Sequence, residues 1–158
     1  MASESTGAVQ EMFAKLTEKG VENIEAALLR IPEGKRSWSP EGKARTALDQ
    51  VAEVALLNGN SATIITARAW PEDFNFDQYY QDKATIAAST EVALAKLKET
   101  LPLAVAAIRS LSDEDLKILV SMPWGPMTLG EILAYPHWNM SYHEGQINYI
   151  ASMLGCLP

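Results

Sequence analysis

Apolar residues recur at every third or fourth position through four long stretches of this sequence. Residues 5–31, 43–69 and 83–110 show this spacing, and a fourth stretch runs from Thr128 to Gly155. Residues spaced in this way lie along one face of an α-helix, and that face must pack against another element to leave water. We therefore expect an all-α fold, a four-helix bundle with short connecting turns, formed by residues 1–158 as a single domain.

Particular residues mark where these helices begin, bend and end. Thr128 and Glu131 have the spacing of a capping box, which predicts that the last helix begins at Thr128. Pro102 should kink or split the third helix, because proline lacks the N–H of a helical hydrogen bond, and Pro136 should bend the fourth. Residues 72–81 mix acidic and aromatic residues without a clear period, which we interpret as a loop or short turn lying across the bundle. The sequence shows no series of strands.

The distribution of charge argues against a nucleic-acid partner. The formal net charge is −7, and the basic residues are scattered through the chain, whereas phosphate binding requires a clustered basic surface. One local concentration stands out, made of Lys35, Arg36, Lys43 and Arg45. Acidic neighbours offset it, so a solvated loop is favoured there over a binding patch. We expect no nucleic-acid partner.

The chain also has the features of a cytoplasmic protein. No apolar run approaches the roughly 20 residues that a membrane span needs. The first five residues show neither the basic nor the apolar part of a signal peptide. Cys156 is the only cysteine, which excludes an intramolecular disulfide.

His143 is the residue that most directly suggests chemistry. It lies in an otherwise apolar stripe of the last predicted helix, and Asn139 lies one turn before it on the same side. A buried imidazole needs either a hydrogen-bond partner or a metal ion. Taken alone, the pattern favours a structural histidine over a metal ligand.

The sequence around His143 resembles a known family. The run from Tyr142 to Ile150 is similar to the His-x-Gly-Gln signature near the C-terminal end of DinB-like (DinB/YfiT) proteins. Weaker resemblances occur in the same order at residues 38–40, 47–50 and 111–116. The family implies a four-helix bundle in which three histidines bind a divalent metal. Carried over by position, those places fall at Gln50, Asn139 and His143.

Only one of the three implied metal ligands is therefore a histidine in this chain. Amide oxygens are poor ligands for zinc or nickel, so the resemblance implies a weakly bound divalent metal or none. His137 would lie about 120° away from the face of His143, and does not replace the lost ligands. Glu53 could supply an oxygen, although a solvated or hydrogen-bonded glutamate is the favoured interpretation. The set Gln50, Asn139 and His143 could equally form a closed hydrogen-bond network.

Two functions remain open at this point. The favoured one is a bundle that binds a small ligand or a partner, with the former metal pocket now a polar cavity. The alternative is a metal-dependent thiol transferase or hydrolase acting on a small molecule, as the resemblance implies. We also expect a homodimer, because the second helix has more apolar surface than one core can cover.

Overall fold

The computed structural model describes residues 7–157 of the chain and confirms the all-α four-helix bundle. The four long helices are α1 (Ala8–Arg30), α2 (Ala47–Ala67), α4 (Thr90–Arg109) and α5 (Leu129–Met153). A shorter helix, α3 (Phe76–Ile86), and a hairpin of β1 (Leu119–Met122) and β2 (Gly125–Thr128) lie outside the bundle. Two short 3-10 turns, η1 (Glu33–Lys35) and η2 (Asp115–Lys117), complete the structure. The start predicted at residue 5 lies outside the described residues.

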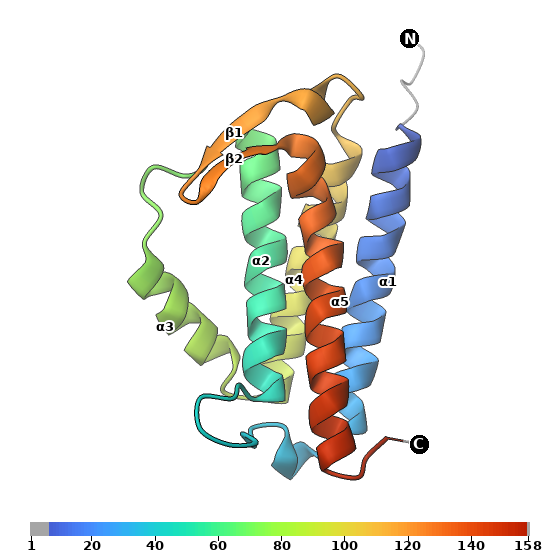
Figure 1. Ribbon diagram of the computed structural model, residues 1–158, viewed down its shortest axis with the longest axis vertical. Coiled ribbons are helices and arrows are strands. Elements are labelled where there is room, and N and C mark those ends of the chain that lie inside the picture. Colours follow the sequence, from blue (N-terminus) through green and yellow to red (C-terminus); the bar gives the residue numbers. More distant parts are fainter. Residues whose placement is uncertain (1–6, 158) are drawn as a thin grey trace.

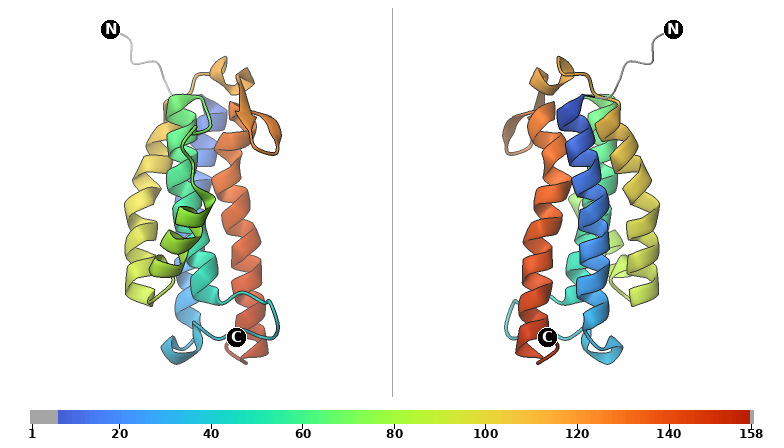
Figure 2. Two further views of the ribbon diagram at one scale, coloured as in Figure 1. Left: turned by 90° about the vertical axis from the view of Figure 1, so that its left-hand side faces the viewer. Right: turned by 90° about the vertical axis from the view of Figure 1, so that its right-hand side faces the viewer.

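The order of the helices around the bundle differs from a simple up-and-down arrangement. α1 packs against α4 and α5, and α2 packs against the same two helices, so α1 and α2 lie diagonally opposite. Figure 1 shows α1 and α5 running in one direction and α2 and α4 in the other. Because α2 and α4 are parallel, the chain must return along the bundle between them. The segment that contains α3 makes this return and lies on the outside of α2 (Figures 1 and 2).

The helix starts follow from local hydrogen bonds. Thr128 Oγ1 accepts the N–H of Glu131 at 3.1 Å, and the Glu131 carboxylate accepts the N–H of Thr128 at 2.7 Å, which confirms the capping box. α2 begins at Ala47, where the side chain of Thr46 accepts the N–H of Asp49. The second helix is therefore four residues shorter at its start than predicted.

The third predicted helix is the least accurate part of the sequence analysis. Residues 83–110 are two helices, because α3 ends at Ile86 and the side chain of Ser89 caps a new helix at Thr90. The predicted loop over residues 72–81 was wrong in its second half, which forms α3. Pro102 does not split α4. Its ring lies on the exposed side of the helix, where water can bind the carbonyl that loses its N–H partner.

The hairpin was also not predicted. β1 and β2 pair antiparallel, with Val120 opposite Met127 and Met122 opposite Gly125. Its strands have only four residues each, and Pro126 interrupts the hydrogen-bonding groups of β2, so the sequence lacks a strand signal. The hairpin closes one end of the bundle, where Val120 is buried in the core.

The core continues through the whole length of the bundle. Its fully buried large side chains come from α1, α2, α4, α5 and the turn that follows α1: Ile24, Leu28, Ile31, Ile65, Leu97, Ile108, Leu129, Leu133, Met140 and Ile147. The apolar surface of α2 packs within this chain, against α4, α5 and α3. The apolar character of α2 is thus explained without a second copy. Among the described residues no helix is long and apolar enough to cross a membrane.

Candidate functional site

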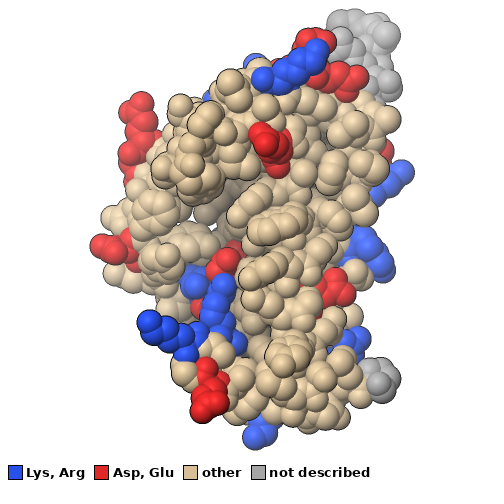
Figure 3. Space-filling view, viewed as in Figure 1, with Lys and Arg blue, Asp and Glu red and all other residues tan. Residues whose placement is uncertain are grey.

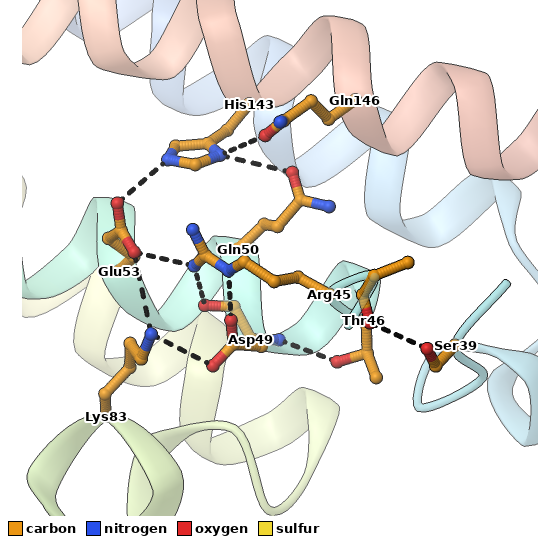
Figure 4. A network of polar contacts seen from close by, with 10 residues as sticks. Ser39, Arg45, Thr46, Asp49, Gln50, Glu53, Lys83, His143 and Gln146 are labelled. Carbon is orange, nitrogen blue, oxygen red and sulfur yellow. Dashed lines mark hydrogen bonds and ion pairs between the residues drawn. The ribbon is translucent and has the colours of Figure 1, made fainter. Parts of the chain in front are cut away.

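His143 lies inside the bundle with both ring nitrogens facing polar side chains. The residue is 2% exposed and projects from α5 toward α2. Its Nδ1 atom is 3.1 Å from Gln50 Oε1 and 2.7 Å from Gln146 Oε1, and its Nε2 atom is 3.2 Å from Glu53 Oε1 (Figure 4). Three side chains from two helices therefore fix the orientation of this ring.

The protonation of His143 depends on the orientation of the two amides. In the arrangement described, Nδ1 faces two amide oxygens and Nε2 faces a carboxylate oxygen. An imidazolium, which donates from both nitrogens, satisfies all three acceptors. A neutral ring that donates to Glu53 needs one amide rotated, so that its NH₂ group donates to Nδ1.

Glu53 is held as a carboxylate. Its pKa falls to about 2 from the ordinary value of 4.5, mainly because it accepts the hydrogen bond from His143. Burial opposes this effect, and the charge of Arg45 adds to it. The second carboxylate oxygen lies 2.7 Å from Arg45 Nη2 and 3.6 Å from Lys83 Nζ. Glu53 therefore remains charged over the whole range of physiological pH.

A row of alternating charges extends from Glu53 toward the surface. Arg45 also donates from Nε to the Asp49 carboxylate, and Lys83 Nζ lies 3.3 Å from Asp49 Oδ1. Arg45 comes from the connection before α2, and Lys83 from α3. These ion pairs tie both segments to the first turns of α2. The connection before α2 and helix α3 are thus both held against the part of α2 that contacts His143.

The structure joins two of the three positions that the family resemblance implied by a hydrogen bond. Gln50 and His143 are hydrogen-bonded, as described above. Asn139 is buried one turn away, but its Oδ1 atom has no hydrogen-bond partner among the described residues. The closed network of three polar side chains therefore lacks Asn139. His137 lies close to the ring of Phe13 on α1, away from His143.

Four residues of this cluster were not recognised as a set in the sequence. The sequence favours a solvated or hydrogen-bonded Glu53 but does not name His143 as its partner, and it includes Gln146 only as part of the His-x-Gly-Gln motif. Glu53 follows Gln50 by three residues and Gln146 follows His143 by three, so helical spacing could have indicated both. Arg45 and Lys83 come from outside the four long helices and gave no such signal.

The donor set does not fit a tightly bound metal ion. The described residues contain no group of three His, Cys, Asp or Glu side chains that could hold one. Around His143 the donors are one imidazole, one carboxylate and neutral amides, which are weak ligands for zinc or nickel. The carboxylate is already paired with Arg45 and Lys83, and both cations oppose a divalent ion.

A cavity of about 230 Å³ opens beside Glu53. It lies between α2, α3, α5 and the hairpin, and Figure 3 shows the hollow on this face of the molecule. Its lining is mainly apolar and aromatic: Glu53, Leu57, Asn60, Ser61, Ile64, Trp70, Phe74, Phe76, Tyr79, Tyr80, Met122, Trp124, Met127, Ile132 and Tyr135. Burial, followed by the charge of Glu53, raises the pKa of Tyr79 and Tyr135, so both phenols stay protonated.

Comparisons with known proteins establish the fold. YfiT from Bacillus subtilis, described as a probable metal-dependent hydrolase with an unusual four-helix bundle topology, superposes with a TM-score of 0.79 at 17% identity, over 98% of this chain and 93% of that one. The colibactin self-resistance protein ClbS has a TM-score of 0.67 at 20% identity, over 99% of this chain and all of its own. This chain has the DinB-like fold. No family model and no curated protein sequence matches it.

A third solved structure shows how varied the activities on this fold are. The mycothiol-dependent maleylpyruvate isomerase has a TM-score of 0.70 at 14% identity. The match covers 87% of this chain and 60% of the isomerase. A protein described as a probable hydrolase, an isomerase and a resistance protein thus share the bundle, which therefore does not specify an activity.

The expectation about nucleic acid needs correction. ClbS, which has the same fold, was solved in complex with a dsDNA, so this class of partner is not excluded for the bundle. The argument from net charge failed because it averages over the whole surface, whereas phosphate contacts depend on local groups of basic residues. The homodimer, which was expected alongside, is not shown either.

Proposed function

We propose that this chain binds a compact, mainly apolar small molecule in the aromatic cavity, with the Glu53–His143 pair at its polar end. The observation that carries this proposal is the lining of the cavity. Seven aromatic side chains line it, and Glu53 is the one carboxylate among the described lining residues. Small-molecule sites commonly combine apolar walls with a few fixed polar groups.

The size and charge of the cavity narrow the class of ligand. An apolar cavity of about 150 Å³ accepts benzene, so a cavity of about 230 Å³ suits one ring with substituents. Glu53 is already paired with Arg45 and Lys83, which offset its negative charge. A neutral ligand with an N–H or O–H donor therefore fits better than a cation, because it can share the carboxylate without displacing either ion pair.

Two fluorinated probes test this proposal by ¹⁹F NMR. We expect 4-fluorophenol to bind more tightly than 4-fluoroanisole, which has the same ring but no donor. Leu57→Trp should abolish binding of both probes, because Leu57 lines the cavity and the larger side chain fills it. Leu29→Trp is the matched control, since Leu29 is exposed on α1 away from the cavity. Equal binding to the parent and to Leu57→Trp would show that the cavity is not the site.

The second candidate is the metal-assisted hydrolase or thiol transferase that the family resemblance implies. It is supported by the likeness to YfiT, which is called metal-dependent, and by the buried position of His143. Metal content and melting temperature should be measured with added zinc or nickel for the parent and for His143→Ala. Stoichiometric metal and a rise in melting temperature that the variant loses would favour this candidate.

A gain-of-function variant tests whether positions 50, 139 and 143 correspond to the three metal-binding histidines of the family. Gln50→His with Asn139→His restores the three histidines that the family implies. Tight zinc or nickel binding by this double variant would support the carry-over of all three positions. Failure to bind would mean that positions 50, 139 and 143 do not form one metal site in this chain.

A further inference from the structure

A second hollow lies on the other side of His143. It is an open groove of about 590 Å³ between the connection that precedes α2 and the C-terminal half of α5. The groove is lined by Pro40, Lys43, Ala44, Arg45, Gln50, Tyr142, Gly145, Gln146, Tyr149, Ile150 and Met153. It shares no lining residue with the aromatic cavity. His143 connects the two, because Nδ1 faces Gln50 and Gln146, and Nε2 faces Glu53.

The charge of this groove is opposite to that of the cavity. Lys43 and Arg45 line it, and no carboxylate does so among the described residues. Lys43 is exposed and forms no ion pair within the described part of the chain. Arg45 uses Nε and Nη2 for Asp49 and Glu53, which leaves its Nη1 group without a partner among residues 7–157. Asp49 and Glu53 offset the charge of Arg45, so the uncompensated positive charge of the groove is that of Lys43, beside the N–H donors of Arg45 Nη1.

The wall of the groove formed by α5 carries exposed aromatic and apolar side chains. Tyr142 and Tyr149 lie seven residues apart on one face of α5 and are 54% and 68% exposed. Met153 continues the same wall. Exposed tyrosine rings in a hollow offer flat surfaces on which a planar group can stack. The groove therefore combines cationic groups on one side with an apolar face on the other.

Gly145 provides a separate reason to expect a ligand here. It lies in the interior of α5, where glycine costs roughly 1 kcal/mol relative to alanine. A Cβ atom at this position would meet nothing within 4 Å, so packing within the chain does not require glycine. A larger side chain would instead occupy the groove, because Gly145 is part of its lining. The space kept open by this glycine is space that a ligand can use.

We infer that this groove is a binding site for a small organic oxyanion, a carboxylate or phosphate monoester on a planar body. The anion would be held by Lys43 and Arg45, and the planar body would lie against Tyr149 over Gly145. The inference stands on the groove alone and does not require that the aromatic cavity binds a ligand.

Two anions and a neutral compound of similar size test this inference by ¹⁹F NMR titration. We expect 4-fluorobenzoate and 4-fluorophenyl phosphate to bind in this groove, and 4-fluoroanisole not to bind there. Lys43→Gln should weaken anion binding roughly three- to tenfold, which is the usual effect of one charge-assisted contact near a surface. Lys117→Gln, at an exposed lysine of η2 beside the start of α5, is the matched control and should have no effect.

Gly145→Leu separates loss of the site from loss of the fold. Leucine favours the helix, so this variant should be at least as stable as the parent while it blocks the groove. Tighter binding of the phosphate would identify a phosphate monoester as the preferred class, and tighter binding of the benzoate a carboxylate. The inference is wrong if neither anion binds at millimolar concentration, or if Gly145→Leu and Lys43→Gln bind them as the parent does.

The cavity-filling variant keeps the two proposals apart. Leu57→Trp should leave anion binding unchanged, because Leu57 does not line the groove. Anion binding that survives in this variant supports the groove even if no probe enters the cavity. Anion binding that is lost in Leu57→Trp would place the anion in the cavity and overturn the inference.

Discussion

The hydrogen bond from His143 to Glu53, together with the ion pair to Arg45, predicts how the stability of this protein depends on pH. Its pKa is about 2 in the folded chain, against 4.5 as the ordinary value. This difference corresponds to about 3 kcal/mol of stability at neutral pH, since each pKa unit is worth about 1.4 kcal/mol. The side chain is only 23% exposed, so solvent screening reduces this figure little.

The sign follows from proton binding. The folded pKa is the lower one, so the folded state binds fewer protons than the unfolded state between pH 4.5 and pH 2. The contribution is complete above pH 4.5 and is lost as the pH falls through that range. At pH 3 about 1.5 kcal/mol of it should remain.

Glu53→Gln isolates this contribution from the titration of the other acids. Urea unfolding followed by circular dichroism at 222 nm gives the free energy of unfolding of the parent and the variant at pH 6 and pH 3. The difference between them should be smaller at pH 3 by about 1.5–2 kcal/mol. Glu33→Gln, an exposed position in η1, is the control and should show a small difference that does not change with pH.

The same assay can contradict the reasoning in two ways. A difference between parent and Glu53→Gln that is equal at pH 6 and pH 3 would mean that Glu53 is not held as a carboxylate by its partners. His143→Ala removes the largest cause of the lowered pKa. If this variant keeps the full pH dependence of the parent, the hydrogen bond between His143 and Glu53 does not have the role assigned to it.

Three further predictions use equilibrium unfolding of the same protein. Thr128→Ala removes the capping box at the start of α5 and should lower the free energy of unfolding by about 1 kcal/mol, whereas Thr128→Ser should keep most of it. Leu97→Ala creates a cavity at a fully buried position and should cost about 2–5 kcal/mol; a loss below 1 kcal/mol would mean that α4 is loosely packed. Asn139→Leu replaces a buried amide whose oxygen has no partner among residues 7–157 and should raise stability by about 1 kcal/mol, while a clear loss of stability would show that Asn139 binds something in the native protein.

The periodic part of the fold could be predicted from the sequence, and the irregular part could not. Four helices follow from apolar spacing, and the start of α5 follows from Thr128 and Glu131, because both signals are local. The break between α3 and α4 was missed because the residues before Ser89 are alanines, which favour a helix. The hairpin was missed because its strands are too short to show alternation.

The candidate site could be predicted only where it lies on the long helices. Gln50 and His143 were paired through a family resemblance, and the structure joins them directly. Arg45 and Lys83 reach Glu53 from a connection and from α3, which no periodicity relates to α2. Contacts of this kind depend on how the chain returns between its parallel helices, and that return is set by tertiary packing.

The small amount of burial in α3 has a consequence for how the aromatic cavity fills. This helix buries one residue, Ile86, yet contributes Phe76, Tyr79 and Tyr80 to the wall. Its opening should require much less free energy than unfolding of the bundle, so its amide hydrogens should exchange with solvent well before those of α2. A compound bound against these rings would slow that exchange. Hydrogen–deuterium exchange of the α3 amides would then report whether the aromatic cavity is occupied.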